Sequence, residues 1–187
     1  MAEVTPMMKQ YLELRDKYKD CILFYRLGDF YELFYDQAEL CSRELELTLT
    51  GKDCGQEQRA PMCGIPFHAI NTYIPKMVEK GYKVAICEQV EDPKNAKGLV
   101  KRDVVKIITP GTITDSTMLD EKKNNYIASI IKEKSNIAFS FCDISTGEFK
   151  VTSFNGIDSD IKLINEISRV LPSEVILHDS IKKDISL

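Results

Sequence analysis

The segment Cys21–Leu27 limits the possible folds more than any other part of the chain. It is an apolar run, rich in aromatic residues, and it ends at Gly28. A short apolar run that is closed by glycine is typical of a buried β-strand followed by a tight turn. We therefore expect a fold built around a sheet, with this strand inside it.

Helical patterns alternate with strand patterns in the first part of the chain. A helix is expected from Pro6 to about Lys19, because Thr5 and Pro6 suit the N-cap and the first position of a helix. Apolar residues at helical spacing over Asp29–Glu44 predict a second helix, and His68–Lys80 predicts a third.

Strand patterns and glycine-rich connections fill the rest of this first part. Strands are expected at Leu45–Thr50, Tyr82–Val90 and Asp103–Thr109. Glycine and proline predict a turn at Gly51–Asp53 and a loop at Gly55–Pro66. Together these patterns predict an α/β domain over residues 1–110.

A polar stretch after Pro110 separates a second unit. We expect a linker at residues 111–124 and a second domain at residues 125–187. Strands and one helix are expected there in the order Tyr126–Lys132, Ile137–Asp143, Glu148–Phe154, Asp158–Leu171 (the helix) and Glu174–His178. This β-β-β-α-β order begins many α/β folds, and Ser145–Gly147 suits a hairpin turn. The chain ends before a full sheet could close, so we expect the second domain to be truncated.

The composition argues against several classes of protein. A net charge of −4 gives no overall attraction for nucleic acid, so any contact with DNA requires a local patch. No apolar run approaches the roughly 20 residues of a membrane span, and the N-terminus lacks the features of a secretory signal. The six cysteines lie in or beside apolar segments and not at the spacing of a disulfide scaffold, which predicts a reducing, cytoplasmic location.

The motifs of common catalytic sites do not occur in the sequence. Gly51-Lys52 is followed by Asp53, which breaks the pattern of a phosphate-binding loop. Neither a Cys-x-x-Cys pair nor a histidine and cysteine cluster has zinc spacing. Asp143, at the end of a strand, resembles a metal-binding carboxylate of nuclease folds, but a turn-capping role is favoured because no second carboxylate is placed to share a metal. We expect no catalytic residue and no metal ligand.

A surface for contact with nucleic acid is the alternative to an enzyme. Aromatic residues are crowded between residues 24 and 35, and a polar loop carries Lys94, Lys97, Lys101 and Arg102. Aromatic side chains beside cations bind nucleic acid by stacking and by phosphate contact. An aromatic core next to an ordinary solvated loop produces the same pattern, and the pattern alone favours that second interpretation.

Several ordered strings of residues resemble the MutS family of DNA mismatch repair proteins. The longest is Leu23–Asp36, which contains Gly28-Asp29-Phe30-Tyr31-Glu32. The others are Thr5–Tyr11, Pro61–Ala69, Val84–Gln89, Ile108–Thr112 and Asp143–Gly147. The resemblance therefore covers the first unit and continues into the second.

The resemblance implies a fold, partners and cofactors. The first domain would be a mixed-sheet α/β module that recognises mispaired or unpaired bases in duplex DNA. The second would be the start of a connector domain with a ribonuclease H-like fold, without nuclease activity, that takes part in signalling to MutL. The intact family protein is a homodimer that uses ATP and Mg²⁺ through a domain absent from these 187 residues, for which no cofactor is expected.

The resemblance also implies roles for individual residues. Phe30 would be an aromatic wedge that enters the minor groove beside a mispaired base and kinks the duplex. Glu32 would hydrogen-bond that base. Lys52, Lys101 and Arg102 would lie near the DNA backbone.

Helical periodicity places Phe30 in a different environment from the one that a wedge requires. On a helix over Asp29–Glu44 it falls in the middle of the apolar stripe, which would bury it. Its position in the first turn of that helix, just after Gly28, would let the side chain project beyond the core. Together with the family resemblance, this position leads us to expect that Phe30 is exposed.

Two rival functions remain as alternatives. One is a nuclease or RNA-processing enzyme in which Asp143 binds a metal. The other is a protein-interaction module whose main partner is MutL rather than DNA.

Overall fold

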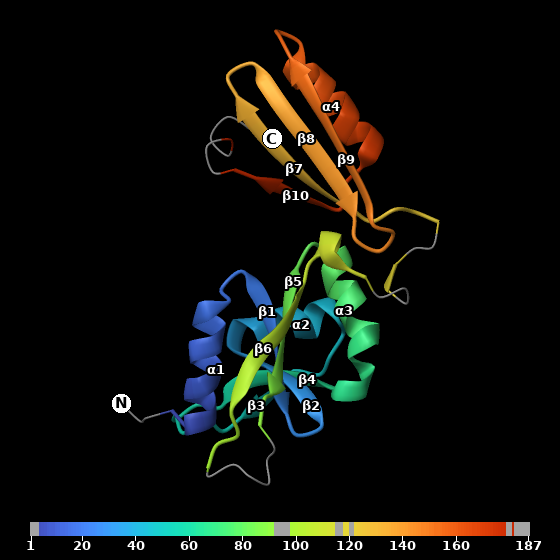
Figure 1. Cartoon of the computed structure of the whole chain (residues 1–187). Coiled ribbons are helices and arrows are strands. Elements are labelled where there is room, and N and C mark those ends of the chain that lie inside the picture. The colour runs from blue at the N-terminus through green and yellow to red at the C-terminus, as the bar shows by residue number, and fades with distance from the viewer. Residues whose placement is uncertain (1–3, 92–97, 115–117, 120–121, 179–180, 182–187) are drawn as a thin grey trace. The chain divides into compact units, whose positions relative to one another are not determined.

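The computed structural model describes residues 4–91, 98–114, 118–119, 122–178 and 181. The chain divides into two compact units, Met1–Ile108 and Thr109–Leu187 (Figure 1). The domain limits expected at residues 1–110, 111–124 and 125–187 remain predictions.

A mixed sheet forms the centre of the first unit. Its strand order is β3-β4-β2-β1-β5-β6, in which β1 runs parallel to β5 and all other neighbours are antiparallel. The strands are β1 (Cys21–Leu27), β2 (Phe30–Phe34), β3 (Thr50–Lys52), β4 (Ala60–Pro66), β5 (Lys83–Gln89) and β6 (Arg102–Ile108). The buried strand expected at Cys21–Leu27 is confirmed, and it has a neighbour on each side.

Helices cover both faces of this sheet (Figure 1). They are α1 (Pro6–Lys17), α2 (Tyr35–Glu44), the 3₁₀ helix η1 (Phe67–Ala69) and α3 (Ile70–Glu79). α1 packs on one face, where Met8 and Tyr11 join a buried cluster with Leu23 and Tyr25, and α2 and α3 lie on the other. Because β1 is covered on both faces, its buried residues Cys21–Tyr25 do not alternate with charged residues.

The helix expected over Asp29–Glu44 is wrong in its first part. Residues 30–34 form β2, and the helix begins only at Tyr35. Successive side chains of β2 alternate between two faces, with Tyr31 and Leu33 in the core, so the segment follows the two-residue period of a strand. Over so short a length its apolar residues fit either period, and pairing with β1 and β4 decides between them.

Three other expectations for the first unit are wrong. The segment Leu45–Thr50 is a turn and an extended connection that reaches β3 only at its last residue, and Gly51–Lys52 belongs to β3 rather than to a turn. β4 occupies the second half of Gly55–Pro66, although glycine and proline there predict a loop. Pro61 and Pro66 lie near the two ends of β4, where a missing backbone N–H is tolerated.

The second unit contains a mixed sheet with the order β10-β7-β8-β9. Its elements are η2 (Pro110–Thr112), β7 (Tyr126–Glu133), β8 (Asn136–Asp143), β9 (Glu148–Asn155), α4 (Ser159–Val170) and β10 (Glu174–Leu177). β7, β8 and β9 pair antiparallel, and β10 returns parallel to β7. Leu163 of α4 packs with Ile130 and Phe139 in the core. The expected β-β-β-α-β order and the mixed α/β fold class are confirmed.

The segment Thr109–Thr112 is held within the second unit. Gly111 packs so closely against β7 and β10 that an added Cβ would lie 2.8 Å from Cβ of Ile127. The Gly111 N–H donates to Oε2 of Glu174 at 3.1 Å, and the Thr109 hydroxyl donates to the same oxygen. The first part of the expected linker is therefore packed against the sheet, and residues 115–117 and 120–121 of that linker lie outside the described residues.

The cysteines are free thiols, and five of them are buried. Burial raises the pKa of Cys41 and of Cys87 to about 12 and that of Cys63 to about 11. At neutral pH these thiols are protonated, so they act as small apolar side chains and not as nucleophiles. In the ranges that the structure describes, no helix has both the length and the apolar character needed to cross a membrane.

Candidate nucleic-acid interface

The hairpin between β1 and β2 carries Phe30 and Glu32, the two residues that the sequence analysis expects to contact a mispaired base. Leu27 pairs with Phe30, so that only Gly28 and Asp29 form the loop. Gly28 has a φ of +59°, and a positive φ at the first of two loop residues is typical of a type II′ turn, which favours glycine. A Cβ at Gly28 would meet no atom within 4 Å, so the backbone conformation and not a lack of space requires glycine.

Phe30 is exposed, as expected, but it projects from a strand and not from the first turn of a helix. It is the first residue of β2, pairs with Pro66 of β4, and leaves 47% of its surface accessible. Side chains on a strand alternate between faces, so Phe30 and Glu32 lie on the same face and Tyr31 lies on the opposite one. The strand therefore holds the phenylalanine ring and the carboxylate side by side.

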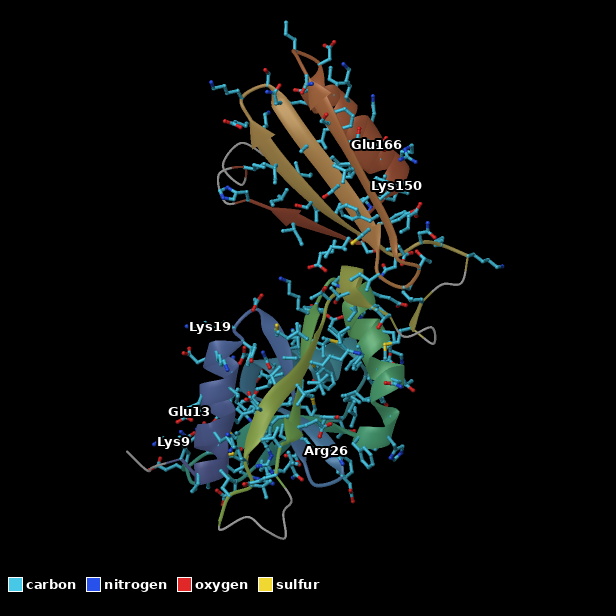
Figure 2. All side chains as sticks on the ribbon, in the orientation of Figure 1. Lys9, Glu13, Lys19, Arg26, Lys150 and Glu166 are labelled. Atoms are coloured by element: carbon cyan, nitrogen blue, oxygen red, sulfur yellow. The ribbon has the colours of Figure 1, made fainter. Side chains whose placement is uncertain are left out.

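Arg26 braces the loop from the opposite face of the sheet. Its Nε donates to the carbonyl oxygen of Gly28 at 2.6 Å. Its guanidinium lies 3.9 Å from the ring centre of Phe67 and 5.5 Å from that of Tyr31. Figure 2 shows this side chain at the hairpin end of the sheet. The backbone carbonyl that precedes Phe30 by two residues is therefore tied to a stacked, half-buried cation.

Two further contacts fix the same end of the sheet. The backbone N–H of Phe67 donates to the carbonyl oxygen of Asp29 at 2.9 Å, which ties the loop to η1. The hydroxyl of Tyr31 donates to the Glu88 carboxylate on β5. Burial, together with this hydrogen bond to a carboxylate, raises the pKa of Tyr31 to about 12, so the hydroxyl stays a donor at neutral pH. These contacts hold the hairpin, and with it Phe30, in one position.

Glu32 forms an ion pair with Lys52. Oε2 of Glu32 lies 2.6 Å from Nζ of Lys52, and the glutamate and lysine side chains are 14% and 27% exposed. The lysine reaches from β3 across the ring of Phe34, 5.8 Å from its centre. Gly64 pairs with Glu32, and a Cβ there would lie 3.1 Å from the carbonyl oxygen of Tyr31, so glycine allows the close approach of β4 to β2 beside the carboxylate.

Lys101 and Arg102 occupy contrasting environments. The Lys101 side chain is exposed, and its backbone N–H donates to Glu91 at 2.6 Å. Arg102 is only 6% exposed. Its guanidinium donates to the carbonyl oxygens of Arg26 and Val100, at 2.7 and 2.9 Å, and to Oε1 of Gln10 at 3.2 Å. Lys94 and Lys97 of the same loop lie outside the described residues.

The structure thus brings together some of the residues predicted from the sequence and separates others. Phe30, Glu32 and Lys52 come together through β2 and β3. Lys101 and Arg102 lie at the start of β6, at the opposite edge of the strand order. The bracing role of Arg26 carries no signal in the sequence, because only the strand register places this residue beside Phe67.

Asp143 caps the turn between β8 and β9, as favoured from the sequence. It is 1% exposed and accepts hydrogen bonds from the backbone N–H groups of Asn125, Ser145 and Thr146 and from the Ser145 hydroxyl. Burial raises its pKa, but these hydrogen bonds outweigh burial and hold the pKa below its ordinary value. Among the residues described, no three His, Cys, Asp or Glu side chains are grouped to hold a metal ion.

Replacing Asp143 by asparagine is expected to destabilise the second unit by about 1–2 kcal/mol at neutral pH, since the amide offers one acceptor oxygen where the carboxylate offers two. The lowered pKa of Asp143 means that its contribution is fully present above the pKa of the unfolded chain. It is lost as the pH falls through the folded-state pKa. Thermal unfolding from about pH 7 to about pH 2 should therefore show the two proteins converging in acid. A difference that grows in acid would contradict the capping role.

The comparisons with known proteins agree with the two units. Residues 5–117 match the family model of MutS domain I, and residues 125–186 match that of MutS domain II. The chain is 59% identical over 187 residues to the DNA mismatch repair protein MutS of Ruminiclostridium cellulolyticum and 61% identical over 178 residues to that of Acetivibrio thermocellus. These matches cover 100% and 95% of the chain but only 21% and 20% of the relatives' own lengths.

The two mixed sheets define a two-unit α/β protein, and the hairpin of its first unit carries an exposed phenylalanine. The chain belongs to the MutS family of DNA mismatch repair proteins, and it comprises domains I and II of that family. It spans about a fifth of the length of the curated relatives that it matches.

Proposed function

We propose that the first domain recognises mispaired or unpaired bases in duplex DNA. Phe30 enters the minor groove as a wedge and kinks the duplex, while Glu32 accepts a hydrogen bond from the displaced base. The observation that carries the proposal is an exposed phenylalanine at the end of a braced hairpin. Full burial of an exposed phenylalanine is worth about 1.5–3 kcal/mol, and about half of this free energy is available to whatever covers the ring, because 47% of Phe30 is exposed.

A wedge explains how one site can act on many mispairs. Inserting an apolar side chain between base steps costs roughly a few kcal/mol in lost stacking. A mispaired step is already weakly stacked and deformable, so it costs less to kink than a paired one. Selection by deformability needs no reading of base sequence, which suits a near-neutral protein whose phosphate attraction is small.

Phe30 can act as a wedge only if the hairpin that carries it is rigid. A wedge that could fold back would lose part of the energy needed to open the base step. Arg26 and Phe67 hold the loop carbonyls of Gly28 and Asp29, so the backbone that carries Phe30 cannot swing away without breaking those contacts. The carboxylate of Glu32 lies two residues further on the same face, within reach of a base next to the ring.

We propose a DNA-backbone contact for Lys101, whose side chain is exposed just before β6 and can meet a phosphate there. The same role for Arg102 has less support, because its guanidinium is buried and its donors are engaged within the domain. Lys52 is already paired with Glu32.

The remaining partners are proposals for the whole protein. We propose that ATP and Mg²⁺ bind to a domain outside this sequence, that the full-length protein is a homodimer, and that domain II contacts MutL. The free cysteines support a cytoplasmic location.

A nuclease is the rival that the structure bears on most directly. A metal-binding carboxylate needs free oxygen lone pairs, whereas the oxygens of Asp143 accept three hydrogen bonds from the turn and one from the backbone N–H of Asn125. Divalent-dependent cleavage of DNA that disappears in Asp143→Asn would nevertheless establish the nuclease. A module that binds MutL alone would leave mismatch preference unaffected by any change at Phe30.

The kinking step can be measured in a full-length MutS protein that carries this sequence as its domains I and II. A short duplex with a central mispair is labelled at both ends, and energy transfer between the labels reports bending. We expect the protein to raise energy transfer on mispaired DNA and Phe30→Ala to abolish that rise, because no ring holds the step open. Phe149→Ala, the loss of an exposed phenylalanine in the second unit, is the control. Unchanged bending in Phe30→Ala would exclude the wedge.

A further inference from the structure

We propose that Lys52 determines base recognition by acting on Glu32, as a positioning residue, and not by contacting a DNA phosphate. The inference rests on the proposed function, since it requires Glu32 to face a base. It explains how the negatively charged Glu32 can contact a base on a surface that also approaches the negatively charged DNA backbone.

The contacts place the lysine where it can control Glu32. Its Nζ lies 2.6 Å from Oε2 of the glutamate, and its side chain crosses the ring of Phe34 to reach that oxygen. Lys52 pairs with Ala60 and Glu32 with Gly64, so the residues of β4 at these two positions are small. The two charged residues therefore lie opposite positions four residues apart on β4, and the length of the lysine side chain spans this offset.

The burial of the pair makes the contact stronger than an ordinary surface ion pair. The lysine and glutamate side chains are 27% and 14% exposed, so water screens them only partly. A phosphate that captured Lys52 would leave the glutamate without its cation, and Glu32 would then face the phosphates of the same duplex as an uncompensated like charge. The exchange is therefore unfavourable, and the lysine stays with the carboxylate.

Lys52 has two effects on Glu32, one on its charge and one on its orientation. It neutralises the carboxylate, which lowers the repulsion between Glu32 and the phosphates. It also occupies one carboxylate oxygen, so that the carboxylate is held in one orientation with its other oxygen available to accept from a base. A glutamate without this partner would be both repelled and free to rotate.

A double-mutant cycle separates action through Glu32 from a phosphate contact. In the full-length protein described above, Lys52→Met and Glu32→Gln are made singly and together, and affinity for mispaired duplex is measured over a series of salt concentrations. We expect Lys52→Met to weaken binding about tenfold when Glu32 is intact, but by less than about twofold in the Glu32→Gln variant. Lys52→Arg, which keeps the cation, should restore most of the affinity.

The opposite results would overturn the inference. An equal loss in both backgrounds, with a salt slope reduced by about 1, would identify a phosphate contact. No loss in either background would show that Lys52 has no part in recognition. Failure of the proposed function would look different, because Glu32→Gln alone would then leave mispair preference unchanged.

A matched control comes from a second ion pair in the same unit. Lys80 pairs with Glu44, at the ends of α3 and α2. Lys80→Met removes one positive charge and one ion pair but should leave mispair preference unchanged, whether or not Glu32 is replaced. Thermal unfolding of each variant checks that the first unit still folds.

Discussion

Replacing Phe30 by alanine is expected to lower the preference of the full-length protein for mispaired over matched duplex by about 10- to 100-fold. Stacking of an aromatic side chain on a base is worth about 1–3 kcal/mol, and that energy is gained only where the step can be opened. Matched DNA opens at a higher cost, so its affinity should change less. Equilibrium binding of both duplexes at one fixed salt concentration measures the ratio directly.

The controls for this change separate the wedge from general apolar contact. Leu49 is exposed to nearly the same degree as Phe30, 46% against 47%, and lies in the same unit. Leu49→Ala should leave the preference unchanged. Phe30→Leu keeps apolar bulk but loses the flat ring, so an intermediate preference is expected. Full discrimination by Phe30→Ala would mean that another part of the protein recognises the mispair.

The second unit was predictable from its sequence because each element carries one clear period. The alternation in Ile137–Asp143 fits only a strand with one covered face, and the isoleucines of α4 recur at helical spacing. The turn at Ser145–Gly147 contains the glycine that its positive φ requires, at Gly147. Local preferences and tertiary structure agree on the order of elements in this unit. The buried face of α4 differs from its isoleucine stripe, because Ile161 and Ile164 are exposed whereas Leu163 and Val170 lie in the core.

The first unit was less predictable because tertiary pairing overrides local pattern there. In the segment that begins at Phe30, a strand of five residues passes directly into a helix at Tyr35, whose φ is +56°. Apolar residues run through the junction, so no change of period marks it. Leu45–Thr50 alternates like a strand, yet the sheet pairs only its last residue. Contacts distant in sequence decide both cases.

The candidate site was also only partly predictable from the sequence, because it too depends on contacts between residues that are distant in the chain. Phe30 and Glu32 were found through family resemblance, whereas helical periodicity alone would have buried the phenylalanine. The ion pair between Glu32 and Lys52 joins β2 to β3, and the brace by Arg26 joins β1 to η1. Both depend on strand order, which spacing along the chain does not reveal. Arg102 shows the converse, since a cation in a basic loop proved to be buried.

Replacing Arg102 by methionine is expected to destabilise the first unit by about 2–4 kcal/mol, because three acceptors lose a charged donor inside the domain. These are the carbonyl oxygens of Arg26 and Val100 and the side-chain oxygen of Gln10. The destabilisation should extend to the hairpin between β1 and β2. Arg102 binds the carbonyl oxygen of Arg26, and the side chain of Arg26 in turn binds the carbonyl oxygen of Gly28. Urea unfolding of the 187-residue chain gives the free energy, and amide exchange locates the change.

The neighbouring lysine provides the control that decides the role of Arg102. Lys101 is exposed, so Lys101→Met should leave stability nearly unchanged and, in the full-length protein, reduce the salt slope of DNA binding by about 1. Arg102→Met should do the reverse, with faster exchange in β1 and β6 and unchanged exchange in β7 and β8. A stable Arg102→Met chain with a reduced salt slope would instead assign Arg102 to the DNA backbone. Because the two residues adjoin, a difference between them must come from burial, which only the fold determines.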